Sequence, residues 1–121
     1  VHFFEHLTGP QRSHFMVELW RVLTPVGKAL LVTPYAWSWR AVADPTHCWP
    51  PVVEQSFLYF NREWREANKL DHCNIRCNFR FECQYVFNPE VSFPGDAEQA
   101  QGALHYLNVV DDLNTLLIKE P

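Results

Sequence analysis

The chain of 121 residues has little glycine, no run of basic residues and no long apolar segment. Its four glycines are scattered, so it contains no Gly-x-Gly loop of the kind that cradles a phosphate. The formal net charge of −4 argues against a surface built to grip a phosphate backbone, and we expect no nucleic-acid partner. No apolar run approaches the roughly 18 residues of a membrane-spanning helix. With no visible signal peptide, we expect no membrane partner and a cytoplasmic location.

What the chain does contain is enough apolar material for one core. Hydrophobic residues make up 47% and aromatic residues 15% of the sequence, which excludes global disorder. This length allows one domain at most, spanning residues 1–121. Because the sequence starts abruptly with the apolar run Val1-His2-Phe3-Phe4, inside an expected strand, we expect a partial domain.

The stretch from Glu5 to Tyr35 is the most informative part of the sequence. Thr8 and Gln11 have the spacing of a capping box, and apolar residues at helical intervals then predict a helix that ends near Leu23. A Thr-Pro-Val-Gly turn follows, and the next segment, Ala29–Thr33, is apolar without alternation. Such a strand is typical of a parallel sheet covered on both faces, so the pattern predicts an α/β fold.

Two motifs in this region resemble class I S-adenosylmethionine-dependent methyltransferases. Glu5-His6-Leu7, a helix, Arg-Val-Leu-Thr-Pro-Val-Gly at 21–27, an apolar strand and Pro-Tyr are similar to the later half of that fold. Asp44-Pro45-Thr46-His47, followed by Ser-Phe-Leu-Tyr-Phe at 56–60, is similar to one branch with phage-associated members. The family has a glycine where this chain has Val26, so we expect the turn to avoid positive φ there.

The resemblance implies a partial Rossmann-like sheet made of the later strands and helices of a methyltransferase domain. The segment entering Glu5 would be a strand parallel to Ala29–Thr33, and the intact enzyme would transfer a methyl group from S-adenosylmethionine by direct displacement. The family's glycine-rich cofactor loop and ribose-binding acid are absent from this chain. We therefore expect the 121-residue chain alone to be inactive and to need the missing N-terminal half of the fold as a partner.

Further elements follow from periodicity. Apolar residues at helical steps predict a helix from Ser56, its cap, to Ala67. Strict alternation predicts an edge strand over Phe79–Phe87 with one wet face. A short helix capped by Asp96 and a final strand over Asn114–Lys119 complete the chain. The two late strands would form the antiparallel pair that the resemblance implies for the end of the sheet.

Glu5 and His6 are the candidate catalytic residues. They fall where a parallel strand would end, the edge at which ligands bind in open α/β sheets. A histidine could accept a proton from the nucleophile and Glu5 could orient it, or the pair could simply begin the next helix. His2 and Phe3, just before them, are the candidate cofactor-binding residues.

On the substrate side, the candidates are Tyr35, Trp37, Asp44 and His47. Aromatic rings could stack on a flat substrate or instead fill the core. Asp44 and His47 could face a crevice, or form an Asx turn with a local histidine hydrogen bond. The sequence does not disclose the methyl acceptor.

Two other interpretations stay open. Cys73 and Cys77, with the other cysteines Cys48 and Cys83 and with His47 and His72, suggest a small zinc domain, although the spacing is only a near fit and we assign no metal ligands. Alternatively, the chain is a non-enzymatic remnant or binding module. An uncovered sheet edge would then favour a homodimer.

Overall fold

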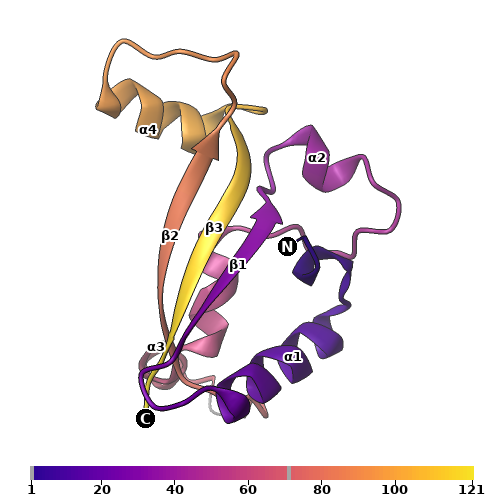
Figure 1. Ribbon diagram of the computed structural model, residues 1–121, viewed down its shortest axis with the longest axis vertical. Coiled ribbons are helices and arrows are strands. Elements are labelled where there is room, and N and C mark those ends of the chain that lie inside the picture. Colours follow the sequence, from indigo (N-terminus) through magenta and orange to yellow (C-terminus); the bar gives the residue numbers. More distant parts are fainter. Residues whose placement is uncertain (1, 71) are drawn as a thin grey trace.

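The computed structural model describes residues 2–70 and 72–121, and it is a mixed α/β fold with helices beside a three-stranded sheet (Figure 1). In chain order the elements are the 3₁₀ helix η1 (Phe4–His6), α1 (Gly9–Val22), β1 (Lys28–Pro34), α2 (Trp39–Val42), the 3₁₀ helix η2 (Glu54–Phe60), α3 (Arg62–Ala67), β2 (Phe79–Phe87), α4 (Asp96–His105) and β3 (Val110–Lys119). None of the helices in these residues is both long and apolar enough to cross a bilayer.

The sheet has the strand order β1-β3-β2, with β3 antiparallel to both neighbours. Leu116 at the middle of β3 faces Leu30 of β1 and Glu82 of β2. β1 and β2 therefore run in the same direction on either side of the last strand. The predicted antiparallel pair of late strands is confirmed, and β3 starts four residues earlier than the sequence predicts, at Val110.

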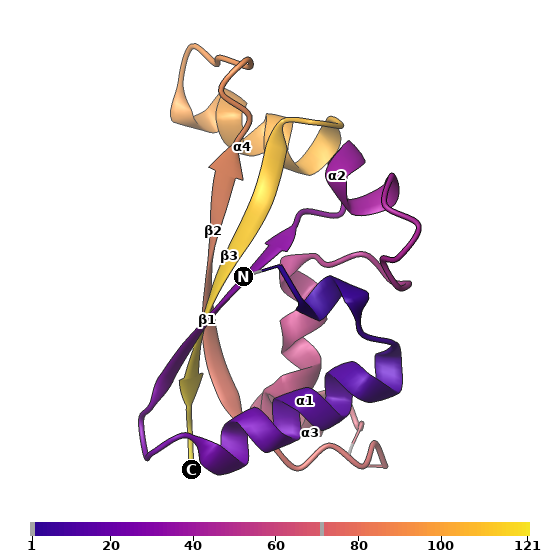
Figure 2. The ribbon, with the colours of Figure 1, turned by 45° about the vertical axis from the view of Figure 1, so that its right-hand side comes forward.

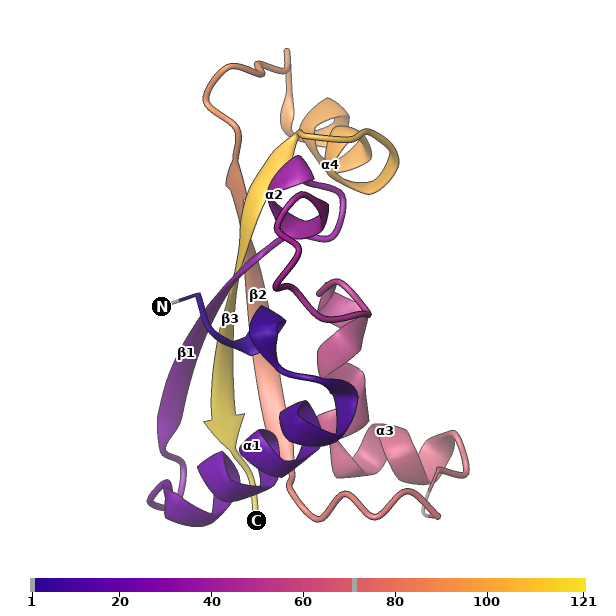
Figure 3. The same cartoon turned by 90° about the vertical axis from the view of Figure 1, so that its right-hand side faces the viewer.

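One face of the sheet carries the core. Phe79, Leu113 and Leu117 point to this face and are fully buried against Met16 of α1 and Phe57 of η2. Figure 3 shows η2 and α3 on one side of the strands, and in Figure 2 most of α1 lies on the same side. The predicted alternation along β2 is confirmed, because its even-numbered residues from Arg80 to Val86 are exposed on the other side.

The prediction that Ala29–Thr33 is covered on both faces is wrong. Leu30, in the middle of β1, is 60% exposed. It shares the open face of the sheet with Leu116 and Glu82, its neighbours across the strands. The apolar run reflects one face packed on α1 and η2 and a second face that the described residues leave uncovered.

The predicted parallel partner of β1 is also absent from the described residues. His2 and Phe3 lie outside any strand, and Phe4–His6 forms a 3₁₀ turn beside β1 (Figure 2). Its backbone hydrogen bonds are local, from the His6 amide to the Phe3 carbonyl and from Leu7 to Phe4, so they are not available to a strand ladder. Val1, which the prediction included, lies outside the described residues.

The predicted helix over 56–67 is two helices separated by Asn61. This residue is extended, with φ −100° and ψ 125°, and its Oδ1 accepts from the Trp64 amide at 2.8 Å to cap α3. Its Nδ2 donates to the Phe79 carbonyl at 3.0 Å, which ties the break to β2. Ser56 is not the cap, because η2 begins at Glu54. Its hydroxyl instead accepts from the Val53 amide at 3.1 Å.

Of the remaining α-helices, α1 and α4 follow the sequence closely, whereas α2 was not predicted. Thr8 is the N-cap of α1, and the Gln11 side chain accepts from its amide at 2.9 Å, as the capping-box spacing predicts. α4 covers the predicted region, but Gly95 rather than Asp96 occupies its N-cap position. Gly102 of α4 lies against the Phe93 ring, so a larger residue there would have to displace that ring.

Val26 has a positive φ of 54°, contrary to the prediction that the turn avoids this conformation. The Gly27 amide donates to the Thr24 carbonyl at 2.8 Å, which closes a four-residue turn. Pro25 has a fixed negative φ, so the left-handed residue of the turn must be the next one. A β-branched side chain is strained in that region.

We predict that Val26→Gly stabilises the protein by about 0.5–1 kcal/mol, because glycine removes the left-handed strain at a small entropic cost. Val26 is 74% exposed, so little packing is lost. Urea unfolding followed by circular dichroism measures the change. Gly27→Ala is the control. Its new Cβ would lie 2.7 Å from the Thr24 carbonyl oxygen, and it should destabilise. A lower unfolding midpoint for Val26→Gly would contradict the strain.

Candidate functional site

A pocket of about 430 Å³ lies beside the carboxyl end of β1. Pro34, the last residue of β1, forms part of its wall. The residues that line it are His2, Glu5, His6, Pro34, Trp39, Arg40, Ala43, Asp44 and His47. Five of the eight residues that the sequence nominates for function thus lie together, although about 40 positions separate the two groups.

Arg12 holds the two groups of pocket residues together. Its guanidinium donates to the carbonyl oxygens of Phe4 at 3.1 Å and Glu5 at 3.3 Å, before α1. It also donates to Cys48 at 3.0 Å and Pro50 at 2.6 Å, which follow the second motif. Arg12 is 6% exposed, and this burial lowers its pKa from the ordinary value. One buried side chain therefore satisfies four backbone carbonyls from two distant segments.

A hydrogen-bonded chain fixes the ring of His6. The Thr46 hydroxyl donates to Asp44 Oδ1 at 2.7 Å, and His6 Nδ1 lies 3.0 Å from that hydroxyl oxygen and 3.3 Å from the Thr46 carbonyl. A carbonyl only accepts, and the hydroxyl proton is already used, so Nδ1 carries the hydrogen. The Nε2 atom of a neutral His6 then keeps its lone pair.

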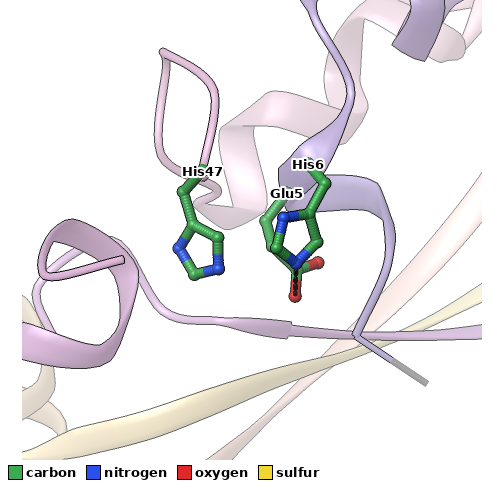
Figure 4. Close-up of side chains that lie close together, drawn as sticks. All are labelled: Glu5, His6 and His47. Carbon is green, nitrogen blue, oxygen red and sulfur yellow. Dashed lines mark ion pairs between the residues drawn. The ribbon is translucent and has the colours of Figure 1, made fainter. Parts of the chain in front are cut away.

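His47 has the same tautomer for the same reason. Its Nδ1 lies 3.0 Å from the carbonyl oxygen of Ala41, which can only accept. The rings of His6 and His47 meet edge to face with their centroids 4.7 Å apart. Figure 4 shows both rings and the Glu5 carboxylate directed toward the same space.

Glu5 is a buried carboxylate without a hydrogen-bond donor. The residue is 4% exposed, and neither of its carboxylate oxygens has a partner among the described residues. His2 Nδ1 lies 3.3 Å and His6 Nε2 4.0 Å from Oε1, within the range of ion pairs but without hydrogen-bond geometry. A buried carboxylate in this state is costly, so its position marks a place where a cation or donor is favourable.

Asp44 forms the Asx turn that the sequence offered as one of two interpretations. Its Oδ1 accepts from the Thr46 amide at 2.8 Å as well as from the hydroxyl. These hydrogen bonds, with smaller contributions from the nearby histidines, hold the pKa of Asp44 below its usual value. The carboxylate also lies 3.6 Å from His47 Nε2, so both the turn and the pocket position are present.

The other nominated residues do not line this pocket. Tyr35 is 2% exposed and packs on Tyr85, with ring centroids 5.2 Å apart. Burial, followed by the charge of Glu54, raises its pKa to about 12, which makes it a core residue rather than a base near neutrality. Phe3 packs edge-on against Phe15 instead.

Trp37 is half-exposed and its carbonyl accepts from the Asn108 amide at 2.8 Å, at the approach to β3. The rim carries a further pair that the sequence did not nominate. Arg40 donates to Asp112 Oδ2 at 3.3 Å, and Asp112 belongs to β3.

The cysteines do not gather. Cys77 is buried, which raises its pKa to about 11, and Cys83 lies beside the Thr115 hydroxyl at 3.5 Å. Within residues 2–70 and 72–121, the one group with three converging metal-ligand side chains is Glu5, His6 and His47, and it contains no cysteine.

Arg12 is the main functional residue that sequence reasoning missed. It lies on a helix with polar neighbours. Its acceptors are backbone carbonyls, which every residue has, so the sequence does not identify them. The combination of Glu5-His6 with a distant Asp-Pro-x-His segment was the available signal that two loops meet.

Comparisons of the chain with protein families, curated proteins and solved structures found no match.

We predict that Arg12→Ala lowers the free energy of unfolding by about 3 kcal/mol or more, because it leaves several carbonyls without a donor. Arg12→Lys should be intermediate, since an ammonium group cannot reach both segments with a planar fork. Urea denaturation measures both. Arg21→Ala, which removes an exposed pair with Glu18 on the same helix, is the control and should leave the midpoint unchanged. An unchanged midpoint for Arg12→Ala would rule out this role.

Proposed function

We propose that this chain is the later half of a class I S-adenosylmethionine-dependent methyltransferase. The observation that carries the proposal is the position of the pocket. The Glu5-His6 and Asp44–His47 motifs, which support the resemblance independently, come together at the carboxyl end of β1. In open α/β sheets this edge is where ligands bind, because its loops are free to shape a site.

The order of elements supports the proposal. A helix over Gly9–Val22 leads into β1, and the chain ends in two antiparallel strands, as the resemblance implies. The unpaired edge of β1 and the open face of the sheet are the surfaces that a missing front half would cover. η1 lies beside that edge (Figure 2), so a strand entering from a longer chain has a place next to β1.

The pocket residues suit the acceptor side of a methyl transfer. The free Nε2 of His6 can take a proton from a hydroxyl or amine nucleophile while Thr46 holds the opposite nitrogen. Asp44 and Arg40 supply charges at the rim with which a polar acceptor can pair. Most of the rate acceleration would come from holding the acceptor in line, because direct displacement requires proximity and alignment.

The cofactor does not fit the residues present here by themselves. When bound, S-adenosylmethionine supplies a methyl group on a positively charged sulfur. Phe3 is turned toward Phe15, and among the nominated cofactor residues only His2 reaches the pocket wall. The described residues offer no glycine-rich amide cradle, so the cofactor's adenosine would be held by the missing half.

We predict that residues 1–121 show no micromolar binding of S-adenosylmethionine in calorimetry. The open reading frame upstream of the Val1 codon should encode a strand followed by Gly-x-Gly. The extended chain should bind the cofactor, and replacing that first glycine with a bulky residue should abolish binding. A stop codon close upstream, or micromolar binding by residues 1–121 alone, would refute the proposal.

A second candidate function is a self-associating binding module. The specific observation is the open sheet face, where Leu30 is 60% exposed and the outer edges of β1 and β2 have no strand partner in the described residues. Exposed strand edges and apolar faces favour pairing between copies.

We predict that, if the chain functions in this way, sedimentation velocity shows a homodimer that Leu30→Lys converts to a monomer. The charge would lie in the middle of the open face and would be costly to bury. Glu98→Lys, at an exposed position of α4 outside the sheet, is a charge-changing control that should leave the dimer intact. A monomer at all concentrations for the unmodified chain would exclude the module and leave the methyltransferase proposal untouched.

A further inference from the structure

We propose that Glu5, His6 and His47 bind one divalent transition-metal ion, of the class of zinc or iron(II), with open coordination positions facing the pocket. One donor atom from each of these three side chains lies within 4.8 Å of the other two. Figure 4 shows the three side chains directed toward a common point from η1 and from the loop that follows α2. The inference does not depend on methyl transfer.

The tautomers of the two histidines suit metal binding. Both Nδ1 atoms carry hydrogens that are donated, to the Thr46 hydroxyl at 3.0 Å and to the Ala41 carbonyl at 3.0 Å. The Nε2 atoms are left as free ligands. A histidine that binds a metal ordinarily donates its second ring hydrogen to such an oxygen, which fixes the ring and raises its basicity. The Thr46 hydroxyl is held in turn by Asp44 at 2.7 Å.

The Glu5 carboxylate is independent evidence for a bound cation at this site. Its side chain is 5% exposed, and both oxygens lack a hydrogen-bond partner. A buried carboxylate is ordinarily paired or coordinates a metal. The neighbour nearest to it, His2, is 40% exposed and lies 3.3 Å away without hydrogen-bond geometry, so it satisfies the carboxylate poorly.

The ligand set selects the class of ion. Two imidazoles and one carboxylate are typical of zinc and non-haem iron sites that keep positions open, whereas magnesium and calcium prefer oxygen ligands. Bonds of about 2.0–2.1 Å in a tetrahedral site place ligand atoms about 3.3 Å apart, so the three donors must approach one another by up to about 1.5 Å. The Glu5 carboxylate, which no hydrogen bond holds, can supply most of this movement, and small turns of the two rings about their Nδ1 hydrogen bonds can supply the rest, because the pocket of about 430 Å³ leaves room.

The test is titration of the purified, metal-free 121-residue chain with zinc and with cobalt(II). We expect one ion per chain by calorimetry and a rise in melting temperature of roughly 5–10 °C at a hundredfold excess over the dissociation constant. Magnesium at the same concentrations should have no effect. No zinc binding, or magnesium binding as tight as zinc, would overturn the proposal.

Variants assign the ligands. Glu5→Gln keeps the shape of the side chain and should weaken zinc binding at least tenfold, as should His47→Ala. Thr46→Val replaces no ligand, but it removes the hydroxyl that holds His6 Nδ1 at 3.0 Å and leaves only the Thr46 carbonyl at 3.3 Å, so it should cost about 10–100-fold in affinity. His105→Ala, an exposed histidine on α4, is the matched control and should bind zinc normally. Unchanged affinity in Glu5→Gln and His47→Ala would overturn the proposal.

Cobalt(II) separates this site from one made of cysteines. Nitrogen and oxygen ligands give weak visible bands, whereas thiolate ligands add an intense charge-transfer band in the near ultraviolet. We expect only the weak bands, and a Cys73→Ser/Cys77→Ser variant should give the same spectrum. An intense band that disappears in this variant would place the ion on the cysteines and overturn the proposal.

Discussion

The structure around the pocket depends on the buried guanidinium of Arg12. It satisfies four carbonyl groups, two in the segment that contains η1 and two in the segment after the Asp44–His47 loop. A planar fork with five donors can do this, and the usual cost of burying a cation is offset by hydrogen bonds in several directions. The Cys48 amide adds a direct backbone bond to the Glu5 carbonyl at 2.8 Å. These hydrogen bonds hold η1 and the Asp44–His47 loop together. They therefore also fix the positions of Glu5 and His6 relative to His47.

The second constraint is the asymmetry of the sheet. α1 and η2 cover one face, and the other face carries charged, polar and apolar residues such as Glu82, Gln84 and Leu30. On this face the 60% exposure of Leu30, in the middle of β1, is the feature to be explained. Both proposed functions explain it by a covering partner, either the front half of a larger sheet or a second copy. They differ in what covers β1. In the methyltransferase proposal it is a parallel strand of the missing half, and in the binding-module proposal it is a second copy of the chain.

The chemistry of the pocket follows from how its polar groups are paired. The Nδ1 atoms of His6 and His47 donate to the Thr46 hydroxyl and to the Ala41 carbonyl, and Asp44 holds that hydroxyl in place. The Nε2 atoms of both histidines therefore remain for a ligand. The same two atoms can accept a proton or bind a metal ion, but not both at once. A metal at this place would act as a Lewis acid on an oxygen in the pocket, which is a different role from that of a free general base. Glu5 favours metal binding over general-base catalysis. Its buried carboxylate lacks a hydrogen-bond donor and would be stabilised by a metal ion, whereas it is not needed to orient His6, because Thr46 already fixes the tautomer of that ring.

The sequence by itself determined the local elements. The helix that ends near Leu23 and the strands around Leu31 and Cys83 follow from periodicity and capping residues, which act within a few positions, whereas the antiparallel pairing at the end of the chain was expected from the resemblance. It also nominated Glu5, His6, Asp44 and His47, because short motifs carry their own chemistry. The left-handed Val26 could not be predicted in this way, because a proline at the second position suits both the turn in which the next residue has a positive φ and the turn in which it has a negative φ.

Only the tertiary structure decided which of those residues meet. An apolar strand reads the same whether one face or both are covered, so the exposure of Leu30 depends on where the helices pack. The single helix expected over 56–67 is broken at Asn61 by a bond to β2, a contact 18 positions away. Arg12 binds carbonyl groups, which every residue possesses, so no sequence pattern identifies its partners. The convergence of Glu5, His6 and His47 rests on that contact, and long-range contacts of this kind are set by packing rather than by spacing.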